Sequence, residues 1–168
     1  MKNKYAKVIN IILAIMTVVS AVMAAGMMFC FADVLVGFPG MCDECNAGHS
    51  MNIRIFISLL VTVIQTIMTI VLYVGARREI KDGGTVNTAL CGVVNIILSL
   101  IVFLCMVGTG PSTHGAENLL LSIYWIVCLV TPVSSIAFIF LNVAAIITAN
   151  FYDTEKWRLV RAEKEQNA

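Results

Sequence analysis

The chain has 168 residues, of which 60% are hydrophobic and only 12% are charged, and its mean hydropathy is +0.92. Soluble domains usually carry about twice that fraction of charged residues, so the composition excludes a soluble globular protein. The length leaves room for one bundle and no separate soluble domain, and the mixed signs of the charged segments exclude a basic surface that binds nucleic acid.

Four apolar stretches contain no Asp, Glu, Lys, Arg or His: about Val8–Phe31, Ile55–Val74, Val86–Val107 and Leu119–Ala149. Since a helix rises 1.5 Å per residue, about 20 apolar residues cross the hydrocarbon core of a bilayer. The sequence therefore predicts an all-α integral membrane protein, a bundle of four transmembrane helices in up-down-up-down order. The absence of charge inside the spans argues against proton relays and ion pathways.

The first stretch follows three lysines, as the apolar region of a signal peptide does. It continues over about 24 apolar residues, whereas that region of a signal peptide usually has about 7–15. We therefore expect a retained first helix. Its small residues recur four apart, a spacing that lets helix backbones approach closely. These residues are Ser20, Ala21, Ala24 and Ala25.

The loop after the first stretch contains the one candidate reactive site. Cys42 and Cys45 form a Cys-x-x-Cys motif, and His49 follows four residues later. Three interpretations remain open: a structural Cys42–Cys45 disulfide, thiol–disulfide exchange with Arg54 as the nearby cation, and a metal site formed by Cys42, Cys45 and His49. Two thiolates and an imidazole suit Zn²⁺ or Cu⁺.

The Cys-x-x-Cys motif in a first outer loop resembles that of the bacterial membrane disulfide oxidoreductases, which reoxidise a periplasmic thiol oxidase with quinone. The resemblance implies a four-helix protein with both ends in the cytoplasm, redox roles for Cys42 and Cys45, and quinone as cofactor. The chain departs from this family because the loop 108–118 has no second cysteine pair. Arg54 also lies farther from the motif than the family's arginine does.

The second stretch carries polar, uncharged residues at spacings of three to four, so they share one helix face. These residues are Ser58, Thr62, Gln65, Thr66 and Thr69. In the third stretch, Asn95 and Ser99 lie one turn apart. We expect these faces to pack against other helices, since apolar side chains provide little drive for association in lipid. Contact with an uncharged solute is the alternative.

Between the second and third stretches, residues 75–85 form the predicted inner loop. Its sequence Asp82-Gly83-Gly84-Thr85 predicts a turn followed by an N-cap at Thr85.

In the fourth stretch, Pro132 predicts a kink, and Ser134 and Ser135 are placed to bond the carbonyls that it frees. The tail, residues 150–168, alternates acidic and basic residues and predicts a short amphipathic helix at the membrane surface. We expect this helix to begin at Asp153 or Thr154 and to place Trp157 among the lipid headgroups.

Ten of the 11 Lys and Arg residues lie before the first span, in the middle loop or in the tail; Arg54 is the exception. By the positive-inside rule, both termini and the middle loop are cytoplasmic. We predict a multi-pass protein of the plasma membrane. Its leading function is a non-enzymatic accessory or helix-packing subunit that contacts a membrane protein or a second copy through its small and hydroxyl faces.

Two other functions compete with the leading one. The first is an extracytoplasmic thiol-redox or metal-handling protein that acts through Cys42, Cys45 and His49, with membrane thiol–disulfide oxidoreductase as the enzyme class and quinone, zinc or copper as the cofactor. The second is a transporter of small uncharged solutes. The leading function predicts no cofactor.

Overall fold

The computed structural model describes residues 4–36, 47–107 and 119–166. Near the ends of these ranges, it describes the backbone of some residues without their side chains. Within them lie four helices: α1 (Lys4–Val36), α2 (Ala47–Asp82), α3 (Ala89–Met106) and α4 (Leu119–Gln166). Each helix contains a segment long and apolar enough to cross a membrane. The prediction of an all-α bundle of four helices, each long and apolar enough to span a membrane, is thus confirmed.

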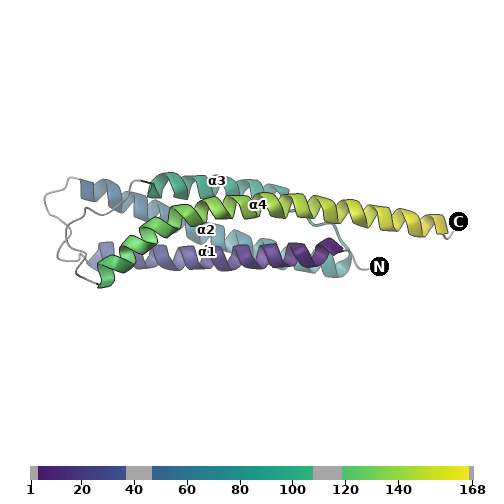
Figure 1. Cartoon of the computed structure of the whole chain (residues 1–168), viewed down its shortest axis with the longest axis horizontal. Helices are drawn as coiled ribbons and strands as arrows, with labels where there is room; N and C mark the ends of the chain where they lie inside the picture. Colours follow the sequence, from purple (N-terminus) through teal and green to yellow (C-terminus); the bar gives the residue numbers. More distant parts are fainter. Residues whose placement is uncertain (1–3, 37–46, 108–118, 167–168) are drawn as a thin grey trace.

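The four helices form one elongated bundle in which successive helices run in opposite directions (Figure 1). Each helix packs against two neighbours, in the order α1, α2, α3, α4 and back to α1. The start of α1 and the end of α4 lie at the same end of the bundle (Figure 1). Because α1 packs against both α2 and α4, it contributes to the bundle in the same way as the other three helices.

Buried residues recur at alternating spacings of three and four in every helix, which is the heptad spacing of a helix bundle. In α1 and α2 they are Ile9, Leu13, Met16, Ser20, Met23, Met27 and Cys30, and Ile55, Ser58, Thr62, Gln65, Thr69, Leu72 and Ala76. In α3 and α4 they are Gly92, Asn95, Ser99, Val102 and Met106, and Cys128, Thr131, Ser135, Phe138, Asn142, Ala145, Ala149 and Tyr152. One face of each helix therefore forms the interior.

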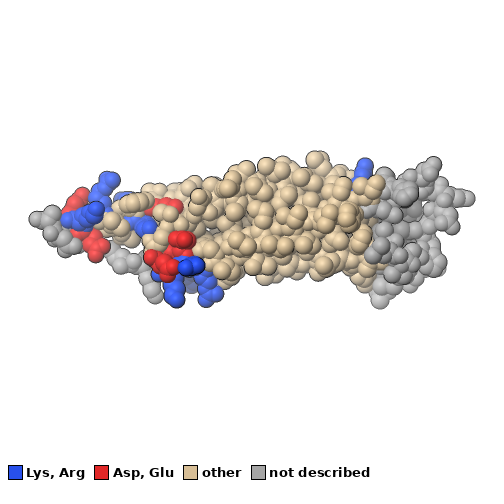
Figure 2. Space-filling model, turned by 180° about the vertical axis from the view of Figure 1, so that it is seen from behind, with Lys and Arg blue, Asp and Glu red and all other residues tan. Residues whose placement is uncertain are grey.

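Charged side chains are concentrated at one end of the bundle. Nearly all the described Lys, Arg, Asp and Glu side chains gather at the end that holds the two helix termini, and the middle is uncharged (Figure 2). In α2, the charge-free stretch between Arg54 and Arg77 has 22 residues, or about 33 Å of helix. This length matches the hydrocarbon thickness of a bilayer, about 30 Å.

The helix α2 extends eight residues beyond the predicted end of its span and stops at a glycine. Gly83 has φ +69°, the left-handed conformation that glycine adopts without a Cβ clash. The N–H of Gly84 donates to the carbonyl of Glu79 at 2.7 Å, which completes a Schellman cap. The predicted turn is correct, but the predicted N-cap at Thr85 is wrong, since α3 begins after Thr88.

The first part of α4 is bent relative to the rest of the helix (Figure 1), and Pro132 lies inside this helix. Proline has no N–H to bond the carbonyl four residues back, and its ring clashes with the preceding turn. Side chains bond neighbouring carbonyls: Thr131 Oγ1 donates to Val127 O at 2.7 Å, and Ser135 Oγ donates to Thr131 O at 2.9 Å.

The tail does not form a separate surface helix, contrary to our expectation, because α4 continues without a break to Gln166. The two predicted starting residues have other partners. Asp153 Oδ1 accepts a hydrogen bond from the N–H of Val86 at 3.2 Å, and Thr154 Oγ1 donates to Asn150 O within the same helix. Neither side chain therefore caps a new helix, and α4 projects beyond the bundle (Figure 1).

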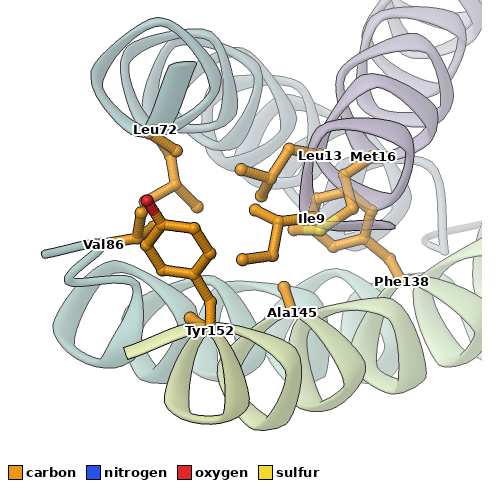
Figure 3. Close-up of a cluster of buried hydrophobic side chains, with 10 residues drawn as sticks. Ile9, Leu13, Met16, Leu72, Val86, Phe138, Ala145 and Tyr152 are labelled. Carbon is orange, nitrogen blue, oxygen red and sulfur yellow. The ribbon is translucent and has the colours of Figure 1, made fainter. Parts of the chain in front are cut away.

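An apolar cluster fills the interior at the charged end, with buried side chains from α1, α2, α4 and the α2–α3 turn (Figure 3). Ile9, Leu13 and Met16 of α1 meet Phe138, Ala145 and Tyr152 of α4. Leu72 and Val86 complete the cluster from α2 and the α2–α3 turn. This cluster fills the interior of the half of the bundle that holds the start of α1 and the end of α4.

Gly92 allows α3 to approach α4 closely. A Cβ at this position would lie 2.7 Å from Ile146 Cδ1, so Gly92→Ala forces this side chain to move. We expect a loss of about 1 kcal/mol in the free energy of unfolding, measured by unfolding in mixed micelles. Gly75→Ala is the matched control, since a Cβ at Gly75 has nothing within 4 Å. Equal loss in both variants contradicts close α3–α4 packing.

Candidate functional site

The middle of the bundle interior is polar but uncharged. Ten buried Ser, Thr, Asn and Gln residues, here called the polar layer, come from all four helices. They are Ser20, Ser58, Thr62, Gln65, Thr69, Asn95, Ser99, Thr131, Ser135 and Asn142. The hydroxyl and amide face predicted for α2 therefore points into this chain's own bundle, together with Asn95 and Ser99 of α3.

Polar contacts join three of the four neighbouring helix pairs. Ser20 Oγ and Thr69 Oγ1 lie 3.0 Å apart between α1 and α2. Gln65 Nε2 donates to Ser99 Oγ at 2.6 Å and to Asn95 O at 3.3 Å, which joins α2 to α3. Thr131 Oγ1 lies 3.8 Å from Met27 Sδ, between α4 and α1. These contacts fix the relative heights of the helices.

Several polar atoms of the layer have no hydrogen-bond partner among the described residues. They are Ser58 Oγ, Gln65 Oε1, Asn95 Nδ2 and Oδ1, and Asn142 Oδ1. Gln65, Asn95 and Asn142 are almost completely buried. An amide buried without a hydrogen bond costs about 1–3 kcal/mol. The layer thus contains both donors and acceptors whose hydrogen bonds are not made within the described residues.

The outer surface of the bundle is apolar throughout its middle. Of the described residues in 8–32, 55–74, 89–107 and 126–149, every exposed one is apolar. Leu104, Val133 and Phe140 are among the most exposed. Such a surface suits lipid tails. The chain therefore directs its polar side chains inward.

Of the predicted reactive residues, the structure describes only His49 and Arg54, which lie near the start of α2. Cys42 and Cys45 fall outside the described residues, and so does the predicted Cys42–Cys45 disulfide. His49 lies in the first turn of α2, but its side chain is not among those described. Arg54 is exposed on the same helix. The redox and metal interpretations of this loop stay predictions.

The described cysteines, Cys30, Cys91, Cys105 and Cys128, form no disulfide with one another. Over the same described ranges, no group of three or more His, Cys, Asp or Glu side chains is placed to hold a metal ion. Comparison with protein families, curated proteins and solved structures finds no match to this chain.

Sequence reasoning missed the part of the polar layer that α4 contributes, namely Thr131 and Asn142. The available signal was spacing, because Thr131, Ser135 and Asn142 follow the same alternation of three and four that marks the polar face of α2. The pairing of Ser20 with Thr69 was also missed. It depends on the relative height of two helices, which a single sequence does not encode locally.

Proposed function

We propose that this chain is a non-enzymatic four-pass membrane protein that admits small neutral polar molecules, such as water, urea or glycerol, into its interior. The observation that carries the proposal is the polar layer, with unpartnered amide atoms on Gln65, Asn95 and Asn142. Uncharged amides and hydroxyls exchange hydrogen bonds with a neutral solute without the desolvation cost of a charge. The charge-free interior disfavours ions.

Solute permeability of reconstituted vesicles tests this function. We expect vesicles containing the protein to equilibrate water, urea or glycerol faster than protein-free vesicles in stopped-flow light scattering. Asn95→Leu replaces the unpartnered amide with a larger apolar group, so it should return the rate to the protein-free value. Ile97→Leu, at an exposed position of the same helix, is the control. Wild-type vesicles that match protein-free vesicles for all three solutes contradict the function.

We also propose that both ends of the chain are cytoplasmic, on the basis of the positive-inside rule and the charge sorting described above. In a Cys42→Ser, Cys45→Ser background, Arg54→Cys should react with a membrane-impermeant maleimide added to intact cells, whereas Lys164→Cys should react only after lysis. If Lys164→Cys is labelled in intact cells, the C-terminus lies outside and the proposed orientation is wrong.

The second candidate is the accessory subunit predicted from the sequence. The observation that favours it is the outward face of α1, where Ala21, Ala25 and Ala32 are exposed and a partner helix can approach closely. The mass of the protein in mild detergent distinguishes the candidates, because an accessory subunit should run with a partner or a second copy and an independent bundle should run as one chain.

A further inference from the structure

A second buried cluster, at the end of the bundle opposite the charged tail, is rich in sulfur. Its members are Met23, Met27, Cys30, Ile55, Val102, Met106 and Cys128. We define the sulfur cluster as the four of these that carry the inference: Met27 and Cys30 of α1, Met106 of α3 and Cys128 of α4. Their exposed fractions are 0%, 0%, 2% and 5%. Three helices thus bring four sulfur atoms into one closed region.

The heights of the helices place these side chains at one level. Thr131 Oγ1 lies 3.8 Å from Met27 Sδ, which brings α4 to α1 at this point. Cys128 lies one turn before Thr131, and Cys30 lies one turn after Met27. Because α1 and α4 are antiparallel, both steps lead toward the same end of the bundle, so Cys30 and Cys128 lie at the same height.

The bend of α4 and the small residue Gly26 bring the two helices together here. A Cβ at Gly26 would lie 3.2 Å from Val127 Cγ1, a close approach of α1 to α4. Met106 is the last residue of α3, so the sulfur cluster lies at the level where this helix ends.

A buried hydroxyl lies one turn along α2 from the apolar cluster that contains the sulfur cluster. Ser58 is on the interior face of α2, one turn from Ile55 of the same apolar cluster, and it is fully buried. Its Oγ has no hydrogen-bond partner among the described residues. A site in this region therefore has side chains from all four helices around it. It also has one hydroxyl, Ser58 Oγ, whose hydrogen-bonding capacity is not used by the packing of the helices.

We infer that the sulfur cluster binds one Cu⁺ ion. Thiolate and thioether sulfur are soft ligands that select Cu⁺, whereas thioethers are poor ligands for Mg²⁺ and Ca²⁺. Binding replaces the proton of one thiol, Cys30 or Cys128, with the metal and releases one H⁺. One thiolate and two neutral thioethers around Cu⁺ have no net charge, which suits an apolar interior.

Competition for Cu⁺ tests the site. The purified protein carries Cys42→Ser and Cys45→Ser, so the loop motif contributes no thiol. It is titrated anaerobically against the Cu⁺ chelator bathocuproine disulfonate. We expect one tightly held Cu⁺ per chain. Met27→Leu with Met106→Leu should weaken binding by about tenfold or more, although it preserves the packing volume, and Cys30→Ala with Cys128→Ala should abolish it.

The matched controls come from the other end of the bundle. Met16→Leu changes a buried methionine outside the sulfur cluster, and Cys91→Ala changes a partly buried cysteine there; neither should alter the affinity. Circular dichroism of the copper-free variants verifies that they fold. A background protein that retains no Cu⁺, or cluster variants that bind as tightly as the controls, overturns the inference. Solute permeability does not depend on this result, so the two proposals can fail separately.

Discussion

Gln65→Glu should lower the free energy of unfolding by about 3 kcal/mol, the cost of a carboxylate near the middle of a membrane-spanning helix. Gln65 is 1% exposed, and its amide nitrogen donates to Ser99 Oγ at 2.6 Å. The substituted carboxylate has the same shape but can only accept hydrogen bonds, so it loses the bond that Gln65 Nε2 donates to Asn95 O and also carries a buried charge. Reversible unfolding in mixed micelles, followed by circular dichroism, measures the loss.

Two variants show which part of this loss comes from charge. Gln65→Met keeps the length of the side chain and removes the amide, so it should cost about 1 kcal/mol, the size of an interhelical hydrogen bond in a membrane protein. Asn150→Asp makes the same amide-to-carboxylate change at an exposed position of α4 and should leave stability unchanged. If the Gln65→Glu protein is as stable as wild type, Gln65 is in contact with water, which contradicts the packing described here.

Phe138→Ala should cost about 2–3 kcal/mol, because it opens a cavity where the largest fully buried side chain of the described residues now packs. Phe138 lies in the cluster with Met16, Leu13 and Ile9 of α1 (Figure 3). Lipid tails are as apolar as the bundle interior, so transfer of the ring contributes little and the lost packing contributes most of the effect. The same micelle unfolding experiment measures it.

Phe140→Ala is the matched control for this prediction. Phe140 lies two residues along the same helix but is 69% exposed, whereas Phe138 is 0% exposed. Removing its ring leaves space that lipid or detergent fills, so we expect a change of less than about 0.5 kcal/mol. Equal losses in the two variants show that α4 is turned about its axis relative to the arrangement described here.

Local sequence was sufficient for the outline of the fold. Runs of apolar residues without charge predicted four spans, and each of the four helices contains a segment long and apolar enough to span a membrane. The Gly83-Gly84 turn was also correct, because positive φ at glycine is a local property. The start of α3 was wrong by three residues. The cap signal at Thr85 competes with tertiary contacts such as the bond from Val86 N–H to Asp153.

For the tail, charge alternation predicted a surface helix, but nothing between Asn150 and Gln166 breaks α4. The signals at Asp153 and Thr154 are ambiguous in sequence, since both residue types cap new helices and also bond within or between existing ones. Which of these they do depends on the neighbours that the fold supplies.

In the interior of the bundle, some of the buried faces were predictable from the sequence and others were not. The polar faces of α2 and α3 were visible from spacing, because hydroxyls and amides stand out against apolar residues. The interior faces of α1 and of most of α4 could not be predicted from spacing. In these helices the lipid-facing side and the buried side are both apolar, so hydropathy does not distinguish one side from the other. The position of Phe138 inside and Phe140 outside is one example.

The sequence by itself determined four segments long and apolar enough to span a membrane, and the grouping of charged residues outside them, because both are properties of runs of residues. Only the tertiary structure decided which residues meet. Ser20 with Thr69, Gln65 with Ser99, and Met27 with Thr131 are pairs far apart in the chain. They are brought together by the relative heights and rotations of packed helices, which depend on close packing of the whole bundle.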